Sequence, residues 1–410
     1  MKVRAYRVWA AGAAVSNVGT WMQRTAQDWL VLTVLTHSSA TALGVVTALQ
    51  FTPIVLLLPL TGWASDHLDR RRLLMATQAV QGVLALALGV LTVTGLVTLG
   101  QVYVFALLLG VTTAFDGPAR QTFVAELVPE TELGNAVALN STSFNLARMV
   151  GPAVAGVLIA AVGTGWVFLL NGLSFVAVLG SLLLLRPADL RARPRPTATG
   201  RASLLDGFRA VRSDPLTSTV MLMMLLVGTF GLQFQIFVPT MSVAEFGVGS
   251  AAYGMLTSVM AVGSVAGALL AARRSRPGMA ALLAGAAVFA VGLGLAAAAP
   301  GYWLFAVVLV LVGVAAQTFS ATSNTLVQLS TAPHLRGRVM AIYLAVARGG
   351  APVGALLLGW VADAVDPRAG LTVGALAALG AVVIGLRYLV RHRGLHVEHE
   401  SWHVHLALAA

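Results

Sequence analysis

Residues 40–72 read ATALGVVTALQFTPIVLLLPLTGWASDHLDRRR, and the part from residue 40 to residue 61 is almost entirely apolar. A helix of about 20 residues crosses the roughly 30 Å hydrocarbon core of a bilayer. A transmembrane β-strand would instead alternate polar and apolar residues over about 10 positions. Three consecutive arginines, 70–72, follow the apolar stretch. This stretch therefore predicts a membrane-spanning helix that is followed by a basic loop.

The composition of the whole chain extends this prediction. Of its 410 residues, 58% are hydrophobic and 10% are charged, and the mean hydropathy is +0.85. A soluble domain carries about 25% charged residues, so this chain cannot cover a water-facing surface of its size. The absence of cysteine excludes a secreted disulfide scaffold, and the apolar content excludes disorder. We therefore expect an all-α polytopic membrane protein.

Arginine and lysine are concentrated before the first expected span and in alternate loops after it. The positive-inside rule places these loops, and both termini, in the cytoplasm. The net charge of +11 is thus explained by topology, and nucleic acid is not an expected partner. We expect a multi-pass protein of the inner (plasma) membrane that retains its first span. The twelve expected spans are residues 8–36, 40–61, 73–95, 101–122, 135–161, 165–185, 216–242, 251–272, 279–298, 301–322, 337–361 and 370–390.

The chain is expected to consist of two pseudo-symmetric six-helix bundles. Arg148-Met-Val-Gly-Pro152 and Arg348-Gly-Gly-Ala-Pro352 repeat one pattern at an offset of 200 residues. Two such halves enclose a midplane binding site in one class of transporter. The expected parts are an N-terminal bundle at 1–186, a cytoplasmic linker with an amphipathic helix at 187–215, a C-terminal bundle at 216–393 and a cytoplasmic tail at 394–410.

The loop that begins at residue 62 carries a recognisable signature. It resembles the Gly-x-x-x-Asp-Arg/Lys-x-Gly-Arg-Arg/Lys motif of the major facilitator superfamily. The matching positions are Gly62, Asp66, Arg70 and Arg71, and the departures are His67 and Asp69. The resemblance implies that Asp66 locks the cytoplasmic side against the start of span 11, near residues 336–340. Arg70 and Arg71 are candidates for the same cytoplasmic gate, and the arginines here could equally act as topology determinants.

A second signature lies in span 5. Gly151-Pro152-x-x-x-Gly156 is similar to the Gly-Pro motif of exporters in that superfamily. The stretch from Phe115 to Arg120, together with Asn145-x-x-Arg148, resembles the branch that contains the enterobactin exporter and macrolide-efflux permeases. The resemblance implies a transporter that works by alternating access. The candidate hinge residues are Gly151, Pro152, Gly156 and Pro352.

Ionisable residues inside spans are costly, at about 2.5–3.5 kcal/mol each near a helix centre, and usually mark a pathway. Arg24 and Asp28 lie one helical turn apart on the same face, and Asp116 and Arg120 repeat that spacing in span 4. We expect Asp28, and as second choice Asp116, to carry the coupling proton. The alternative is that each pair only neutralises itself to lower the cost of insertion.

Arg148 and Arg348 are the remaining midspan charges, and neither has an acidic residue in its own span. Each therefore needs a partner from another helix, from water or from an anionic substrate. Asp28 or Asp116 is a possible partner of Arg148. Arg348 has no midspan carboxylate in its own half of the chain, which favours substrates with anionic or strongly polar groups. The alternative for Arg348 is a structural contact between two helices.

A mixed polar and apolar cavity, suited to amphipathic solutes, is expected between the spans. Its candidate lining residues are Asn17, Trp21, Arg24, Gln50, Asn145, Arg148, Gln233, Tyr253, Thr257, Gln317, Asn324 and Arg348. The predicted function is proton-coupled export of such solutes, such as drugs, siderophores or secondary metabolites, by a monomer in the lipid bilayer. The alternatives are an importer or facilitator of a small polar or anionic solute, or a transport-inactive receptor or scaffold.

No catalytic or cofactor motif is present, so neither an enzyme nor a cofactor is expected. The chain lacks a Gly-x-x-x-x-Gly-Lys-Ser/Thr loop, which argues against direct use of ATP. His396, His399 and His403 have helical spacing in the tail and could bind a transition metal. The preferred interpretation is an amphipathic cytosolic tail without metal.

Overall fold

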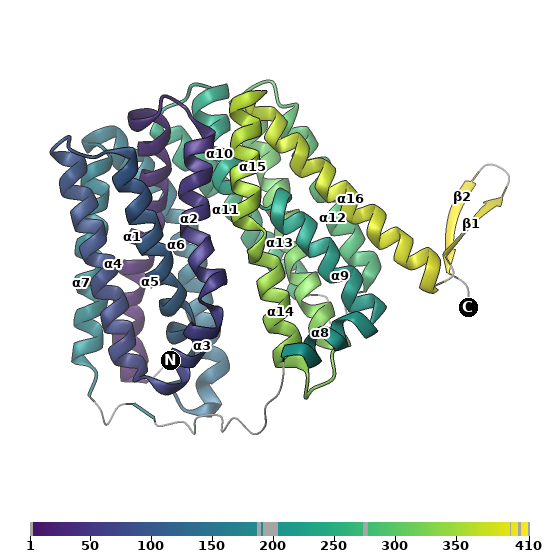
Figure 1. Cartoon of the computed structure of the whole chain (residues 1–410), viewed down its shortest axis with the longest axis horizontal. Helices are drawn as coiled ribbons and strands as arrows, with labels where there is room; N and C mark the ends of the chain where they lie inside the picture. Colours follow the sequence, from purple (N-terminus) through teal and green to yellow (C-terminus); the bar gives the residue numbers. More distant parts are fainter. Residues whose placement is uncertain are drawn as a thin grey trace. The chain divides into compact units, whose positions relative to one another are not determined.

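A computed structural model of the chain describes residues 3–186, 190–191, 204–273, 278–393, 395–400 and 403–408. Almost all of these residues are helical (Figure 1). The segments of the first half are α1 (Arg4–Trp29), the π-helix η1 (Leu30–Leu35), α2 (Ala40–Leu56), α3 (Leu58–His67), α4 (Arg70–Val93), α5 (Leu99–Glu126), the 3-10 helix η2 (Glu130–Glu132), α6 (Leu133–Val162) and α7 (Thr164–Leu184).

The second half is helical in the same way and ends in a short hairpin. Its helices are α8 (Leu204–Ser213), α9 (Pro215–Leu226), the π-helix η4 (Val227–Gly231), α10 (Phe234–Thr240), the π-helix η5 (Met241–Glu245), α11 (Ser250–Ala272), α12 (Met279–Ala297), α13 (Tyr302–Ser330), α14 (Arg336–Gly349), α15 (Ala351–Ala364) and α16 (Pro367–Arg393). The strands β1 (Leu395–Glu400) and β2 (His403–Leu408) pair antiparallel.

Each of the twelve expected spans coincides with one or more of these helices, and the chain is a polytopic, all-helical membrane protein apart from the terminal hairpin. Among the described residues, ten helical segments are long and apolar enough to cross a bilayer, and α2 is a shorter apolar helix. The segment of α1 and η1 is not one of the ten. Its charged residues, among them Arg24 and Asp28, lower its hydropathy. Twelve crossings in two six-helix bundles therefore remain a prediction.

Three spans that were expected to be continuous are interrupted. Span 2 changes direction at Leu57, because Pro59 in the first turn of α3 has no N–H to give to the preceding helix. Span 11 is divided between α14 and α15 at Gly350, two residues before Pro352. Span 7 consists of α9, η4, α10 and η5 in succession. Kinks at proline and at π-helical turns are the usual causes of such breaks.

Several helices begin at caps that can be read in the sequence. The side chain of Thr98 accepts a hydrogen bond from the backbone N–H of Gln101, whose side chain accepts one in return, which is a capping box. Asp214 caps α9 by accepting from Leu216 and Thr217, and Pro215 occupies the first helical position. These local signals fix where the spans start.

The chain packs into two compact units that do not coincide with its sequential halves. The first comprises Met1–Thr199, Gln235–Val262 and Ala355–Pro367, and the second comprises Gly200–Phe234, Gly263–Gly354 and Arg368–Ala410. Parts of α10, α11 and α15 thus pack with the N-terminal helices. Ile236 and Ala355 belong to the same apolar cluster as Leu30, Leu43 and Val46. The division into bundles at 1–186 and 216–393 stays a prediction.

The C-terminal tail differs from the prediction. His396, His399 and His403 were expected to share one helical face that could bind a metal, but residues 395–400 and 403–408 pair as the strands β1 and β2. A strand repeats every two residues rather than every 3.6, so the spacing that would bring the three histidines to one helical face has no such effect here. Trp402 of the predicted tail lies outside the described residues.

Candidate functional site

Trp21 of α1 brings together two of the predicted midspan arginines. The guanidinium carbon of Arg24 lies 5.0 Å from the centre of the Trp21 ring, and that of Arg148 lies 5.7 Å from it. Cations are attracted to the faces of aromatic rings at such distances. Phe144 meets the same ring edge-on, with 5.7 Å between ring centres. Arg148 forms none of the ion pairs found among the described residues, and its guanidinium contacts the indole of Trp21 instead.

Close packing between α1 and α6 makes this cluster possible. A Cβ atom on Gly151 would lie 2.6 Å from the Cβ of Trp21, nearer than any side chain can approach. The two helices can approach this closely because Gly151 has no side chain. Helix α6 continues through Pro152 without a break. The predicted hinge residue Gly151 is therefore, in this structure, a close-packing position against α1.

Asp28, in the last turn of α1, is held by a residue from the second half of the sequence. The phenol of Tyr253 in α11 donates a hydrogen bond to Oδ2 of Asp28 at 3.0 Å. The Tyr253 ring is buried and stacks on Trp29, with ring centres 6.1 Å apart and an interplanar angle of 17°. Thr257 donates to the backbone oxygen of Tyr253 at 3.3 Å. Asp28, Tyr253 and Thr257, which were predicted separately, thus lie in one place.

The remaining Gly-Pro residues of α6 pack against the start of α11. The hydroxyl of Ser250 donates to the backbone oxygen of Gly156 at 3.0 Å. A Cβ on Gly254 would lie 2.2 Å from the backbone oxygen of Pro152, and one on Gly156 would lie 2.5 Å from that of Ser250. Backbone contacts of this kind leave no room for side chains. The segment therefore joins the first half of the chain to the part of the second half that packs with it.

A polar cavity of about 60 Å³ lies inside the first unit. Eight of its lining side chains are polar. Five of these eight carry amide groups, and four of the five are buried: Gln23, Gln27, Gln81 and Asn171. Buried amides require hydrogen-bond partners, and this volume has room for about four water molecules at ~15 Å³ each. The lining residues are Thr20, Gln23, Arg24, Gln27, Gln50, Phe51, Ile54, Gln81, Leu109, Gly110, Thr113, Asn171 and Phe175.

Only Arg24 and Gln50 of this lining were predicted. The amide groups of Gln23 and Asn171 are hydrogen-bonded to each other, whereas the buried Nε2 of Gln27 has no hydrogen-bond partner in the part of the chain that the structure describes. Gln23 and Gln27 are one turn apart on the face that carries Arg24. A row of amides at helical spacing in an expected span was the sequence signal that could have revealed this cavity.

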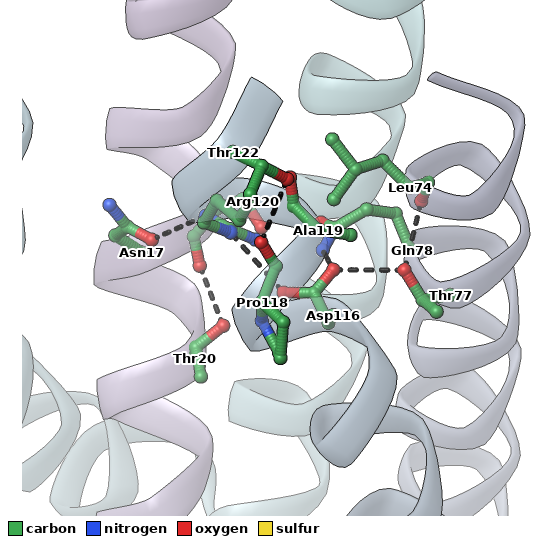
Figure 2. Close-up of polar contacts among 11 residues, drawn as sticks. Asn17, Thr20, Leu74, Thr77, Gln78, Asp116, Pro118, Ala119, Arg120 and Thr122 are labelled. Atoms are coloured by element: carbon green, nitrogen blue, oxygen red, sulfur yellow. Dashed lines mark hydrogen bonds and ion pairs between the residues drawn. The ribbon is translucent and has the colours of Figure 1, made fainter. Parts of the chain in front are cut away.

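Asp116 of α5, the second coupling candidate, is 7% exposed and fully engaged within the first unit (Figure 2). Thr77 and Gln78 of α4 donate to its Oδ1 at 2.9 and 2.6 Å. Arg120 donates to its Oδ2 at 3.2 Å and also to the Oδ1 of Asn17 at 3.0 Å. Figure 2 shows the carboxylate between the helix of Asn17 and the helix of Thr77 and Gln78. Asn17, predicted in the substrate cavity, is part of this network.

The predicted cytoplasmic-gate arginines bind within the first unit. Arg70 forms an ion pair with Glu126 at the end of α5, and the Nε of Arg71 donates to the backbone oxygen of Leu182 at 2.9 Å. Gly62 lies in α3 with open space where a side chain would be. Asp66 lies in the last turn of the same helix, and its side chain is outside the described part of the structure. Its predicted role as a lock is therefore still a prediction.

Predicted cavity residues of the second unit brace a helix junction. The amide of Gln233 donates to the backbone oxygens of Thr229 at 2.9 Å and of Ala351 at 3.3 Å. A Cβ on Gly354 would lie 1.7 Å from the oxygen of Thr229. The start of α15, where Pro352 lies, is thus held tightly against η4. Pro352 lies two residues after the break in span 11 at Gly350, and its hinge role stays a prediction.

The other predicted positions are spread along their helices. Arg348 is exposed near the end of α14, and Asn145 donates to the backbone of its own helix at Ser141, 2.9 Å away. Asn324 accepts a hydrogen bond from Gln328 one turn on, and Gln317 is half-buried in α13. Asn145 belongs to the first unit and the other three residues belong to the second, and a cavity shared by them stays a prediction.

The arrangement of helices is that of known transporters. A bacterial homologue of the lysosomal transporter Spinster, in an inward-facing conformation, superimposes with a TM-score of 0.71 over 95% of this chain and 96% of that one, at 15% identity. The nucleoside transporter NupG gives a TM-score of 0.71 over 95% of this chain and 99% of its own, also at 15% identity. At these identities the likeness establishes the fold alone.

The sequence establishes the family. Residues 1–407 match the transmembrane secretion effector family of the major facilitator superfamily, and the chain belongs to that family. It is a membrane transporter and not an enzyme. The multidrug efflux pump Tap of Mycolicibacterium fortuitum is 28% identical over 365 residues, covering 86% of this chain and 88% of that protein.

Two siderophore transporters are similar to a comparable extent. The staphyloferrin A transporter of Staphylococcus aureus is 25% identical over 354 residues, 84% of this chain and 86% of its own. The enterobactin exporter EntS of Salmonella typhimurium is 26% identical over 333 residues, 80% of this chain and 78% of its own. The predicted resemblance to the enterobactin-exporter branch is thereby confirmed.

Proposed function

We propose that this protein is a proton-coupled exporter of amphipathic small molecules that works by alternating access. In this proposal twelve spans form two six-helix bundles, and both termini lie in the cytoplasm of the cell that carries the protein in its inner membrane. The family supports a transporter, and the names of two relatives, the multidrug efflux pump Tap and the enterobactin exporter EntS, support export. The positive-inside distribution of arginine supports the orientation.

The observation that carries the proposal is the hydrogen bond from Tyr253 to Asp28. It joins a carboxylate in span 1 to span 8, which belongs to the other half of the sequence. Protonation turns an acceptor-only carboxylate into a neutral acid and weakens a charge-assisted bond. A proton that binds Asp28 would therefore loosen a contact between the two halves. Proton binding and conformational change are linked in this way at one residue.

Asp28 suits this role better than Asp116. Asp116 already accepts hydrogen bonds from Thr77, Gln78 and Arg120, which all lie in helices of the first half of the sequence. None of these bonds reaches the second half of the sequence. We therefore assign the coupling proton to Asp28 and a structural role to Asp116.

The polar cavity and the Trp21 cluster are proposed to contact the solute. The amide groups of the cavity can donate and accept hydrogen bonds, while Arg24 supplies a positive charge at its edge. The indole of Trp21, with Phe144 beside it, offers aromatic area. Together these groups suit a solute that has both a polar or anionic part and a ring system, which is the chemistry of amphipathic molecules.

The proposal can be tested with the purified protein in proteoliposomes. An imposed pH gradient should drive movement of a fluorescent amphipathic dye, and a protonophore should abolish it. The gradient-driven part of the flux should be lost in Asp28→Asn, while dye equilibration without a gradient persists. Flux that is the same with and without the gradient in the wild-type protein would overturn proton coupling.

A further inference from the structure

The five-residue pattern Gly-Trp-x-x-Asp occurs twice in the chain, in two different spans. It reads Gly-Trp-Ala-Ser-Asp at residues 62–66, in α3 at the end of span 2, and Gly-Trp-Val-Ala-Asp at residues 359–363, near the end of α15 in span 11. The first copy is the signature whose aspartate was predicted to form a lock. The second copy is described in full by the structure, and it reveals what its aspartate does.

Asp363 binds the first turn of α2. Its Oδ1 accepts the backbone N–H of Ala40 at 2.7 Å, and its Oδ2 accepts the backbone N–H of Thr41 at 2.8 Å and the hydroxyl of Ser39 at 2.9 Å. The first N–H groups of a helix have no partner within the helix, and the positive end of the helix dipole favours an anion there. Asp363 therefore provides an anion where α2 has unsatisfied donors.

The glycine of the pattern lets the two helices meet at this point. A Cβ on Gly359 would lie 2.4 Å from the backbone oxygen of Ala40, and a Cβ on Gly44 would lie 2.5 Å from that of Ala355. As the numbering rises along α2 it falls along α15, so the two helices run antiparallel. Asp363 is thus held next to the start of α2 by direct backbone packing.

The chain before α2 is shaped to present this helix end. His37 and Ser38 have φ values of 49° and 82°, a region that residues other than glycine rarely occupy. The N–H of Ser38 donates to the backbone oxygen of Leu32 in η1 at 2.6 Å, and the N–H of Ser39 donates to the hydroxyl of Thr36 at 3.2 Å. A strained turn persists only where its surroundings fix it, and here it directs the first turn of α2 toward Asp363.

We propose that Asp363 is a latch that holds spans 2 and 11 together at the η1 end of the first unit, where η1 ends and α2 begins. The latch is closed in this structure and opens when the transporter opens on that side. This inference rests on the proposed alternating access.

The test uses a cysteine as a reporter of opening, which is simple because the chain contains no cysteine of its own. Val46 of α2 is 1% exposed and belongs to the apolar cluster that contains Ala355 of α15. In Val46→Cys the thiol should react slowly with a membrane-impermeant maleimide applied from the η1 side of proteoliposomes. Adding Asp363→Asn should raise the labelling rate by about fivefold, which corresponds to the upper range for a charge at an exposed helix end.

A second variant removes the donor instead of the acceptor. Ala40 is the first residue of α2, where proline is tolerated because its missing N–H would have no partner within the helix, and Ser39 already has the extended conformation that proline requires before it. Ala40→Pro should raise labelling of Val46→Cys in the same direction. Combined with Asp363→Asn it should add little, because both changes remove the same contact.

The matched control is Asp366→Asn, which removes the same charge three residues further along. Labelling that rises in Asp363→Asn and Ala40→Pro but not in this control supports the latch. Unchanged labelling in both variants, or an equal rise in Asp366→Asn, would overturn it. Labelling needs neither a solute nor a proton gradient. A failure of the latch therefore leaves the transport assay unaffected, and a failure of transport leaves the labelling result standing.

Discussion

The protein contains two acid–arginine pairs at the same helical spacing, and they are built into the molecule in different ways. Arg24 and Asp28 lie in α1, and Asp116 and Arg120 lie in α5. Asp116 is buried and receives three hydrogen bonds from side chains of its own unit's N-terminal helices. Asp28 is half-buried, and it accepts a hydrogen bond from Tyr253, which lies in the second half of the sequence. The spacing of an acid–arginine pair in the sequence therefore does not indicate which role the pair has. The helices that supply its hydrogen-bond partners distinguish the two pairs.

The strongest test of this comparison is the removal of Asp116. Asp116→Ala leaves Arg120 without its carboxylate and the buried amide of Gln78 without its acceptor, while the hydroxyl of Thr77 keeps the backbone oxygen of Leu74. Breaking a buried ion pair in this way costs about 3–5 kcal/mol. We expect a large fall in the thermal unfolding midpoint of the detergent-purified protein. A variant that unfolds at the wild-type temperature would show that the network contributes little to stability.

The opposite result is expected for Asp28. Asp28→Asn keeps the shape of the side chain and an acceptor for Tyr253, so the unfolding midpoint should stay close to that of the wild type. Gradient-driven dye flux in proteoliposomes should fall about tenfold or more, equivalent to roughly 1.4 kcal/mol. If Asp28→Asn lost stability and kept its coupling, the roles assigned to the two carboxylates would have to be exchanged.

A smaller effect should follow from Tyr253→Phe, which removes the hydroxyl and keeps the ring stacked on Trp29. The lost hydrogen bond corresponds to about 1 kcal/mol. We expect the pH at which half of the gradient-driven flux is reached to shift, with the total flux at saturating gradient reduced only modestly. Tyr103→Phe is the matched control, because it removes the hydroxyl of another tyrosine, half-buried in α5, that is not hydrogen-bonded to Asp28. If the pH profile of Tyr253→Phe were the same as that of the wild type, Tyr253 would have no role in proton coupling.

The smallest effect concerns Arg148. Arg148→Gln removes its cation–π contact with Trp21, which is worth about 0.5–1 kcal/mol at a partly exposed site. We expect a slight loss of thermal stability and a reduced apparent affinity for anionic dyes, measured against a neutral dye of similar size. If the apparent affinities for anionic and neutral dyes fell equally, the role of Arg148 would be in packing rather than in binding the charge of the solute.

The positions of the spans could be predicted because hydropathy and charge alternation are local properties of the sequence. The Gly-Pro segment was also recognisable, since Gly151 and Gly156 had to accept a neighbouring backbone. What each polar residue contacts was less accessible to prediction. Gln233 was placed in the substrate cavity, yet its amide braces the junction of η4 and α15. Its nearest partner is a carbonyl of its own span, and only the break in that helix leaves this carbonyl available.

The polar cavity and the contact of Asp363 with α2 were also not predicted from the sequence, because both depend on contacts between helices. Gln27 and Gln81 were passed over because a single amide in a span is usually a helix contact, and their significance appears only when several helices bring amides together. The repeated Gly-Trp-x-x-Asp pattern marks Asp363 in the sequence but does not indicate its partners, which lie more than 320 residues away. Contacts over such separations depend on packing, which the hydropathy pattern does not specify. The helical spacing of the tail histidines was wrong because a short segment of alternating polarity fits both the 3.6-residue period of a helix and the two-residue period of a strand.

The network around Asp116 also bears on how the protein enters the membrane. Asn17 of α1 and Thr77 and Gln78 of α4 are synthesised before α5, which carries both charged residues of the network. Chains are inserted from the N-terminus onward, so every uncharged partner is already in the bilayer when Asp116 and Arg120 arrive. The two charges arrive on one helix, next to each other, and meet a prepared set of hydrogen-bonding groups. The order of the helices along the chain thus lowers the barrier to inserting the most polar stretch of α5.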